Sequence, residues 1–262
     1  MPERYTSLMA LVLDRPVANV GAIVEAARNA GEVDRNGPVG DPREAQEVLW
    51  GGRMQKAVVR RAEGTDGAPL LRAETYVGGE GLRQGMRRHA QLLRALARAL
   101  PESDRLVAVR DISAVMDRDR AWLDRVAEGH VEQRDAVVVH SEGQGTWWVH
   151  SHGAARFDVP DLELYGLTRS QVEPAEKLLH HIQAQLLRGG LRASLKLDDG
   201  THVHLVPALE AWSSLPLDWP GVGRAGQTRE GHEGPRATIS LTHKPRLGRY
   251  RKDFKGVLKR LR

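Results

Sequence analysis

Apolar residues in the first half of the chain follow two periods, one typical of strands and one typical of helices. Asp14 followed by Pro16 predicts the start of the first helix, because an acidic cap and an early proline favour a helix N-terminus. Gly64 to Gly67 predict a hairpin turn between two apolar runs. The predicted elements are, in order, a strand at 5–13, a helix at 14–31, a loop at 32–43, strands at 48–62 and 70–77, a helix at 80–100, a strand at 106–109 and a helix at 111–127.

The second half of the chain continues with strands, one long helix and glycine-rich connections. Strand formers at 136–140 and 146–152 flank a five-residue loop, and this pattern predicts a β-hairpin. Ser170 and Glu173 form the pattern of a capping box and predict the start of the next helix. The remaining predictions are a helix at 170–189, a hairpin at 191–206 around Asp199-Gly200, a long loop at 212–234 and a strand at 236–242.

The order of these elements indicates the fold class. Strands and helices alternate without the regular βαβ pattern of a parallel sheet, and this order predicts an α+β fold with a helix-backed antiparallel or mixed sheet. The residues at 164–168 form the predicted seam between two packed parts. We therefore expect an N-terminal α+β domain at 1–167, which ends in the Trp-rich hairpin, and a smaller α+β sub-domain at 168–262.

Composition narrows the class of protein. The chain has 262 residues, of which 40% are hydrophobic, and this is enough to form a core. It has no cysteine, so it has no disulfide, thiolate zinc site or cysteine nucleophile. No apolar run approaches the roughly 18 residues that a membrane span needs, and the N-terminal run is too short for a signal peptide. The sequence thus predicts a cytoplasmic protein.

The charge of the chain is concentrated at its C-terminal end. The chain has a net charge of +5, but residues 244–262 hold nine basic residues and one acid, a net of +8, so the rest has a net charge of −3. Apolar residues at helical spacing within the tail predict a basic amphipathic helix. Two interpretations stay open, a helix that docks on the fold and a contact with a protein partner or an anionic polymer. The candidate contact residues are Arg246, Arg249, Arg251, Lys252, Lys255, Lys259, Arg260 and Arg262.

The central stretch, residues 146–163, is the one place where aromatic, imidazole and carboxylate side chains gather. Because side chains alternate along a strand, Trp148, His150 and His152 should share one face. Two histidines at this spacing can bind one metal ion such as zinc, with Asp161 or Glu163 as an oxygen ligand. The alternative is that both histidines are structural residues of the sheet, and in that case the protein has no cofactor.

The same stretch carries a resemblance to a family. Trp148 to Gly153, followed by Arg156 and then by Pro160-Asp161-Leu162-Glu163, resembles the signature of uncharacterised bacterial proteins with a domain of unknown function. That signature has the form Trp-(Leu/Val)-His-(Thr/Ser)-His-Gly, an arginine, and a Pro-acidic-Leu-Glu step. The resemblance implies an intracellular bacterial α+β protein and supplies no activity.

Three functions are compatible with these residues. The sequence shows no recognisable combination of nucleophile, base and orienting group. A non-catalytic binding or interaction protein is therefore the leading hypothesis. The second is a metal-dependent hydrolase with His150, His152 and either Asp161 or Glu163, in which a metal-activated water would lose its proton to a carboxylate. The third is a nucleic-acid-binding module that acts through the basic tail. The sequence does not decide whether the protein is an enzyme, and it favours a protein without catalytic activity.

Overall fold

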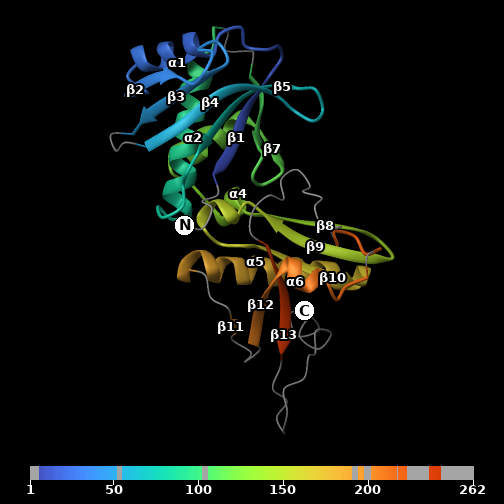
Figure 1. Ribbon diagram of the computed structural model, residues 1–262. Helices are drawn as coiled ribbons and strands as arrows, with labels where there is room; N and C mark the ends of the chain where they lie inside the picture. Colours follow the sequence, from blue (N-terminus) through green and yellow to red (C-terminus); the bar gives the residue numbers. More distant parts are fainter. Residues whose placement is uncertain are drawn as a thin grey trace. The chain divides into compact units, whose positions relative to one another are not determined.

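The chain divides into two compact units, Met1–Ala136 and Val137–Arg262, and each is described by itself (Figure 1). The structure is a computed structural model. It describes residues 6–51, 55–101, 106–190, 194–197, 202–216, 218–222 and 236–242.

The N-terminal unit contains a seven-stranded sheet in which every neighbouring pair is antiparallel. The order across the sheet is β2-β3-β4-β5-β1-β6-β7, so the first strand of the chain lies inside the sheet. The strands are β1 (Ser7–Leu13), β2 (Arg35–Pro38), β3 (Ala45–Trp50), β4 (Gln55–Glu63), β5 (Pro69–Thr75), β6 (Leu106–Asp111) and β7 (Met116–Arg118).

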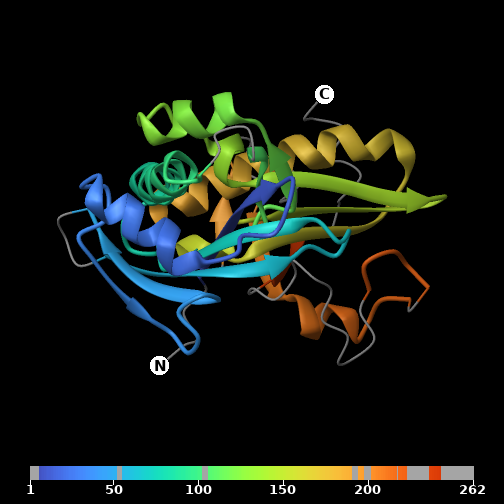
Figure 2. The ribbon, with the colours of Figure 1, turned by 90° about the horizontal axis from the view of Figure 1, so that it is seen from above.

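The helices of this unit are α1 (Val20–Asn29), α2 (Leu82–Arg98), α3 (Arg120–Ala127) and α4 (Gln133–Ala136). The amphipathic α2 turns its apolar side to β1, and α3 and α4 pack against α2 (Figures 1 and 2). His89 in the buried stripe of α2 lies 2.9 Å from the hydroxyl of Ser7, between Nδ1 and Oγ. The odd-numbered residues of β1 thus face the helices, and the even-numbered residues face the other side of the sheet.

Four local predictions for this unit are wrong. The single strand predicted at 48–62 is two antiparallel strands, β3 and β4, with Trp50 opposite Gln55. The first helix begins at Val20, because Asn19 and not Asp14 supplies the cap and accepts a hydrogen bond from the Ala22 N–H. The expected loop at 32–43 contains the polar edge strand β2. The segment 111–119 forms a hairpin with β7 before α3 begins, because the carboxylate of Asp111 accepts a hydrogen bond from the Ala114 N–H and closes a turn.

The C-terminal unit contains a six-stranded mixed sheet in the order β11-β12-β13-β10-β9-β8. The pair β10 and β13 is parallel, and the other pairs are antiparallel. The strands are β8 (Val138–Gln144), β9 (Thr146–His152), β10 (Asp161–Leu167), β11 (Ser194–Lys196), β12 (His202–Pro207) and β13 (Arg236–Thr242). The helices are α5 (Val172–Gly189) and the short α6 (Ala208–Trp212), with 3-10 turns at Ala155–Phe157 and Arg169–Gln171.

The α+β class is confirmed, whereas the boundary that we predicted near residue 167 is not where the two units divide. β10 pairs with β9 on one side and with β13 on the other, so it lies inside the second sheet rather than at a seam. The central hairpin therefore belongs to the C-terminal unit. None of the helices in the described ranges is long and apolar enough to cross a membrane.

Some predictions fall outside the described residues. These are the basic tail at 244–262, the turn at 198–201 and the first residues, 191–193, of the second hairpin, and residues 223–234 of the predicted long loop. The strands of that hairpin are present and confirm its pairing, with Leu195 opposite Val203. The candidate anion-binding residues of the tail stay a prediction.

Candidate functional site

The hairpin of β8 and β9 positions the residues of the central stretch. The two strands pair without a break from Val138 opposite His152 to Gln144 opposite Thr146, so the turn is centred on Gly145. The five-residue loop that we predicted is therefore wrong. Gly145 has φ of +82°, a conformation that glycine adopts without strain, and this permits the tighter turn.

One face of the hairpin packs against α5. Ser151 points to this helix and hydrogen-bonds Gln183, with 3.5 Å between the two side-chain oxygens. The Ser151 hydroxyl also accepts a hydrogen bond of 2.8 Å from the Leu162 N–H on β10. Gln183 donates to the carbonyl of Pro160 at 3.2 Å. These bonds fix β9, β10 and α5 together by polar contacts inside the core, where an unmade hydrogen bond would be costly.

The opposite face of the hairpin carries three imidazoles, and the sequence analysis named only two of them. His140 on β8 lies directly opposite His150 on β9. The ring centroids are 5.8 Å apart for His140 and His150, 5.1 Å for His140 and His152, and 4.8 Å for His150 and His152. Trp148 stacks on His150 at 3.5 Å between centroids. The predicted sharing of one face by Trp148, His150 and His152 is confirmed.

The two candidate carboxylates lie on β10, the strand that pairs with β9. Glu163 is directly opposite His150, and its carboxylate accepts a hydrogen bond from the hydroxyl of Tyr165. The same hydroxyl accepts a 2.7 Å hydrogen bond from the Trp212 indole of α6. Asp161 accepts hydrogen bonds from the Ser151 hydroxyl at 3.3 Å and from the Ala154 N–H at 3.0 Å. Both carboxylates therefore help to hold the fold around the hairpin.

The polar residues that carry the candidate chemistry of the central stretch are buried. His150, His152, Arg156, Asp161 and Glu163 are each at most 4% exposed. Within the described residues, no three or more histidine, aspartate or glutamate side chains are arranged to hold a metal ion. The metal site at His150, His152, Asp161 and Glu163 stays a prediction.

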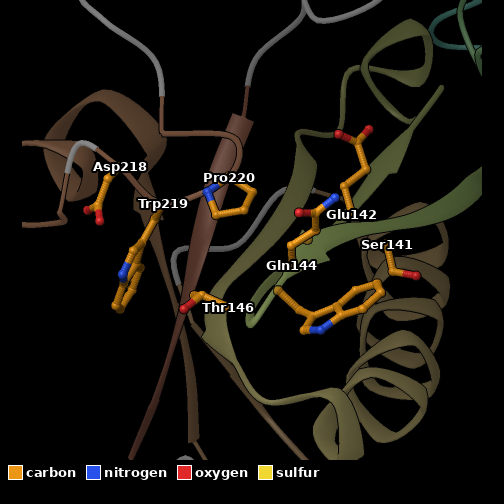
Figure 3. A pocket seen from close by; sticks show the side chains of 9 residues that line it. Ser141, Glu142, Gln144, Thr146, Asp218, Trp219 and Pro220 are labelled. Carbon is orange, nitrogen blue, oxygen red and sulfur yellow. The ribbon is translucent and has the colours of Figure 1, made fainter.

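A pocket of about 710 Å³ opens at the turn end of the same hairpin (Figure 3). Asp218, Trp219 and Pro220 line one side, and the ends of β8 and β9 line the other. The lining residues are Ser141, Glu142, Gly143, Gln144, Thr146, Trp147, Asp218, Trp219 and Pro220. In the described part of the chain, this lining has two carboxylates, two indoles and no basic side chain.

Neighbouring residues hold both indoles of the pocket in place. The guanidinium of Arg169 lies over the ring of Trp147, 4.5 Å from its centroid. The ring of Trp219 packs on the backbone of Gly166, where a Cβ would collide with it, and Gly166 has φ of +70°. The two aromatic walls are therefore preformed, which lowers the entropy lost when a ligand binds.

No family model, no curated protein and no solved structure matches this chain. The resemblance to a bacterial domain of unknown function therefore stays a prediction. The assignment of a function depends on the geometry of the residues alone.

Proposed function

We propose that this protein is a non-catalytic interaction protein whose C-terminal unit binds a basic segment of a protein partner. The observation that carries the proposal is the pocket at the turn end of the β8–β9 hairpin. Glu142 and Asp218 supply negative charge there, and Trp147 and Trp219 supply aromatic surface. Arginine and lysine side chains are attracted to both kinds of group.

The position of the pocket also supports binding rather than catalysis. Glu142 and Asp218 are exposed, and the two indoles are half-buried, so a partner can reach all four side chains. The described lining residues include no histidine, the side chain that most often serves as a general acid or base. Arg169 already shows that a guanidinium is compatible with the Trp147 ring.

We expect a blocked Arg-Gly-Arg tripeptide to bind the full-length protein and to change its tryptophan fluorescence, while a Glu-Gly-Glu tripeptide does not. Asp218→Asn and Glu142→Gln should each weaken binding by about fivefold, since a rim ion pair contributes up to about 1 kcal/mol. Glu173→Gln is the matched control, because Glu173 is an exposed acid of the same unit that pairs with Lys177 on α5. Equal binding of both tripeptides, or an equal loss in the Glu173 variant, would contradict the proposal.

A metal-dependent hydrolase is the second candidate, and the third histidine of the cluster favours it. A zinc ion holds imidazole nitrogens at about 2.0–2.1 Å in tetrahedral geometry, and this places ring centroids about 5 Å apart. The three centroid distances of 4.8, 5.1 and 5.8 Å lie close to that value. His140 would then act with His150 and His152, after the rings turn their nitrogens to a common point.

The metal content of the full chain, purified without a histidine tag, tests this second candidate. If the hydrolase candidate is right, the protein should hold about one zinc ion per chain and its Tm should rise with added zinc. The variant His140→Ala should lose both the bound zinc and the rise in Tm. His181→Ala is the control, because His181 is exposed on α5. Protein that carries no zinc, and whose Tm responds neither to zinc nor to a chelator, removes this candidate.

The basic tail supports a further role for the same chain. A net of +8 in residues 244–262 suits a protein partner, or an anionic polymer such as nucleic acid, whose binding would weaken steeply as salt rises. This role and a cytoplasmic location stay predictions from the sequence.

A further inference from the structure

The N-terminal unit carries three arginines in one row across its sheet. Arg60 on β4 lies directly opposite Arg72 on β5, and Arg72 lies opposite Ala10 on β1. Ala10 is in turn opposite Arg110 on β6. Strand alternation places this row on the face of the sheet that points away from α1 and α2, since Ser7 on the other face contacts His89.

The arginine at one end of the row is fully neutralised. Arg110 donates two hydrogen bonds to Asp66, each 2.9 Å long, and two to Asp117, at 2.8 and 3.0 Å. These bonds lower the pKa of Asp66 to about 2 and raise the pKa of Arg110. Both carboxylates are thereby committed to Arg110.

The other two arginines have much less compensation. Among the described residues, Arg60 has no ion pair and no side-chain hydrogen bond, and its Nε is buried without a partner. The Nε of Arg72 is also buried without a partner, and the nearest carboxylate of Arg72, on Glu74, is 3.8 Å away. The residues that flank this pair in the row are Ala45 and Ala10, which bring no acceptor. Like charges directly opposite on adjacent strands destabilise a sheet.

We propose that Arg60 and Arg72 form a binding site for a single phosphate group of a small ligand. Two adjacent guanidinium forks offer several N–H donors and two positive charges, which match the oxygens and the charge of a phosphate monoester. The bound phosphate would accept hydrogen bonds from the outer N–H groups of the two guanidiniums, because both residues are half-buried rather than buried. The repulsion between the two arginines lowers the stability of the fold. Binding sites commonly reduce stability in this way, because their groups are arranged for a ligand.

The flanking charges on this face favour one compact anion over a polyanion. Lys56 is paired with Glu47, and Arg110 with its two aspartates, so three further carboxylates lie on the same face as the arginine pair. A nucleic acid strand that crossed this face would meet those carboxylates. A ligand with a single phosphate group would not.

The Tm of the full-length protein, measured against phosphate concentration at constant ionic strength, tests the site. Inorganic phosphate at tenfold its Kd should raise the Tm by about 3–6 °C over the value in sodium chloride alone. Arg60→Met should start from a Tm about 1–4 °C higher than wild type, because the repulsion is gone, and should lose the response to phosphate. Arg72→Met should also lose the response.

Lys56→Met is the matched control, because it removes one positive charge from the same strand and the same face. It should keep the full response to phosphate. The same measurement is repeated with adenosine monophosphate in place of inorganic phosphate. A Kd for adenosine monophosphate at least threefold below that of inorganic phosphate identifies a nucleotide as the source of the phosphate. A wild-type Tm that does not respond to phosphate, a response that survives in Arg60→Met, or a lower starting Tm in that variant would overturn the proposal.

Discussion

Replacing Trp148 by alanine should lower the free energy of unfolding of the C-terminal unit by about 3–5 kcal/mol, because it leaves a large cavity in a packed core. Trp148 is 2% exposed, and its ring stacks on His150 and, at 5.9 Å between centroids, on Tyr165. The backbone of Gly221 approaches the ring so closely that a Cβ there would collide with it. The indole therefore joins the strands to the segment that follows α6.

Chemical denaturation, followed by circular dichroism, measures this effect. Trp147→Ala is the matched control, since Trp147 is the neighbouring residue of the same strand but is only half-buried. It should cost clearly less than Trp148→Ala. A loss below about 1 kcal/mol in Trp148→Ala, or an equal loss in the two variants, would mean that the hairpin is not packed as described.

Asp135→Ala should destabilise the N-terminal unit by about 2–4 kcal/mol, because it leaves buried donors without an acceptor. Asp135 is 2% exposed and accepts hydrogen bonds from the Trp122 indole at 3.0 Å and from the Glu132 N–H at 2.7 Å. Arg125 donates two hydrogen bonds, of 2.6 and 3.0 Å, to the same carboxylate. One carboxylate thus ties α3 to α4.

The same carboxylate gives this unit an acid-sensitive stability. Burial raises the pKa of Asp135, but the hydrogen bonds that it accepts, above all from Arg125, outweigh this effect and leave the pKa below 3.8. As the pH falls below about 4, the unfolded chain takes up a proton at this position before the folded chain does. The contribution of Asp135 is therefore complete above that pH and is lost as the pH falls through the folded pKa.

Urea denaturation at pH 7 and at pH 3 measures both effects. Asp135→Asn should be less stable than wild type at pH 7, and the difference between the two proteins should shrink at pH 3. Asp124→Ala is the control, because the Asp124 side chain is 45% exposed and its ion pair with Arg120 is long, at 4.0 Å. This variant should change stability by less than about 0.5 kcal/mol. A difference between Asp135→Asn and wild type that stays constant with pH would contradict the assigned role.

The sequence predicts the elements that depend on local patterns and misses those that depend on distant pairing. The helix α2 is amphipathic over its whole length, so its periodicity alone locates it. The edge strand β2 consists of Arg35-Asn36-Gly37-Pro38, and no local pattern predicts a strand there. The boundary between the units depends on the parallel pairing of Asp161 with Arg236, which are 75 residues apart in the chain.

The histidine cluster of the candidate site could not be predicted in full, because its composition depends on the length of one turn. With a five-residue loop, His140 would lie opposite Thr146, outside the histidine cluster. The turn centred on Gly145 shifts the pairing and brings His140 opposite His150. The pocket was beyond prediction, because its lining combines the hairpin with Asp218, Trp219 and Pro220, and the fold alone brings these segments together.

The most direct test of the proposed interaction is an NMR titration of the tryptophan indole N–H signals of the full-length protein with the Arg-Gly-Arg tripeptide. The chain has six tryptophans, and single Trp→Phe variants assign their signals. We expect the signals of Trp147 and Trp219 to shift in proportion to occupancy, while those of Trp50 and Trp122 in the N-terminal unit stay unchanged. Signals of Trp147 and Trp219 that do not move at saturating peptide would contradict the central claim that this pocket binds a basic segment.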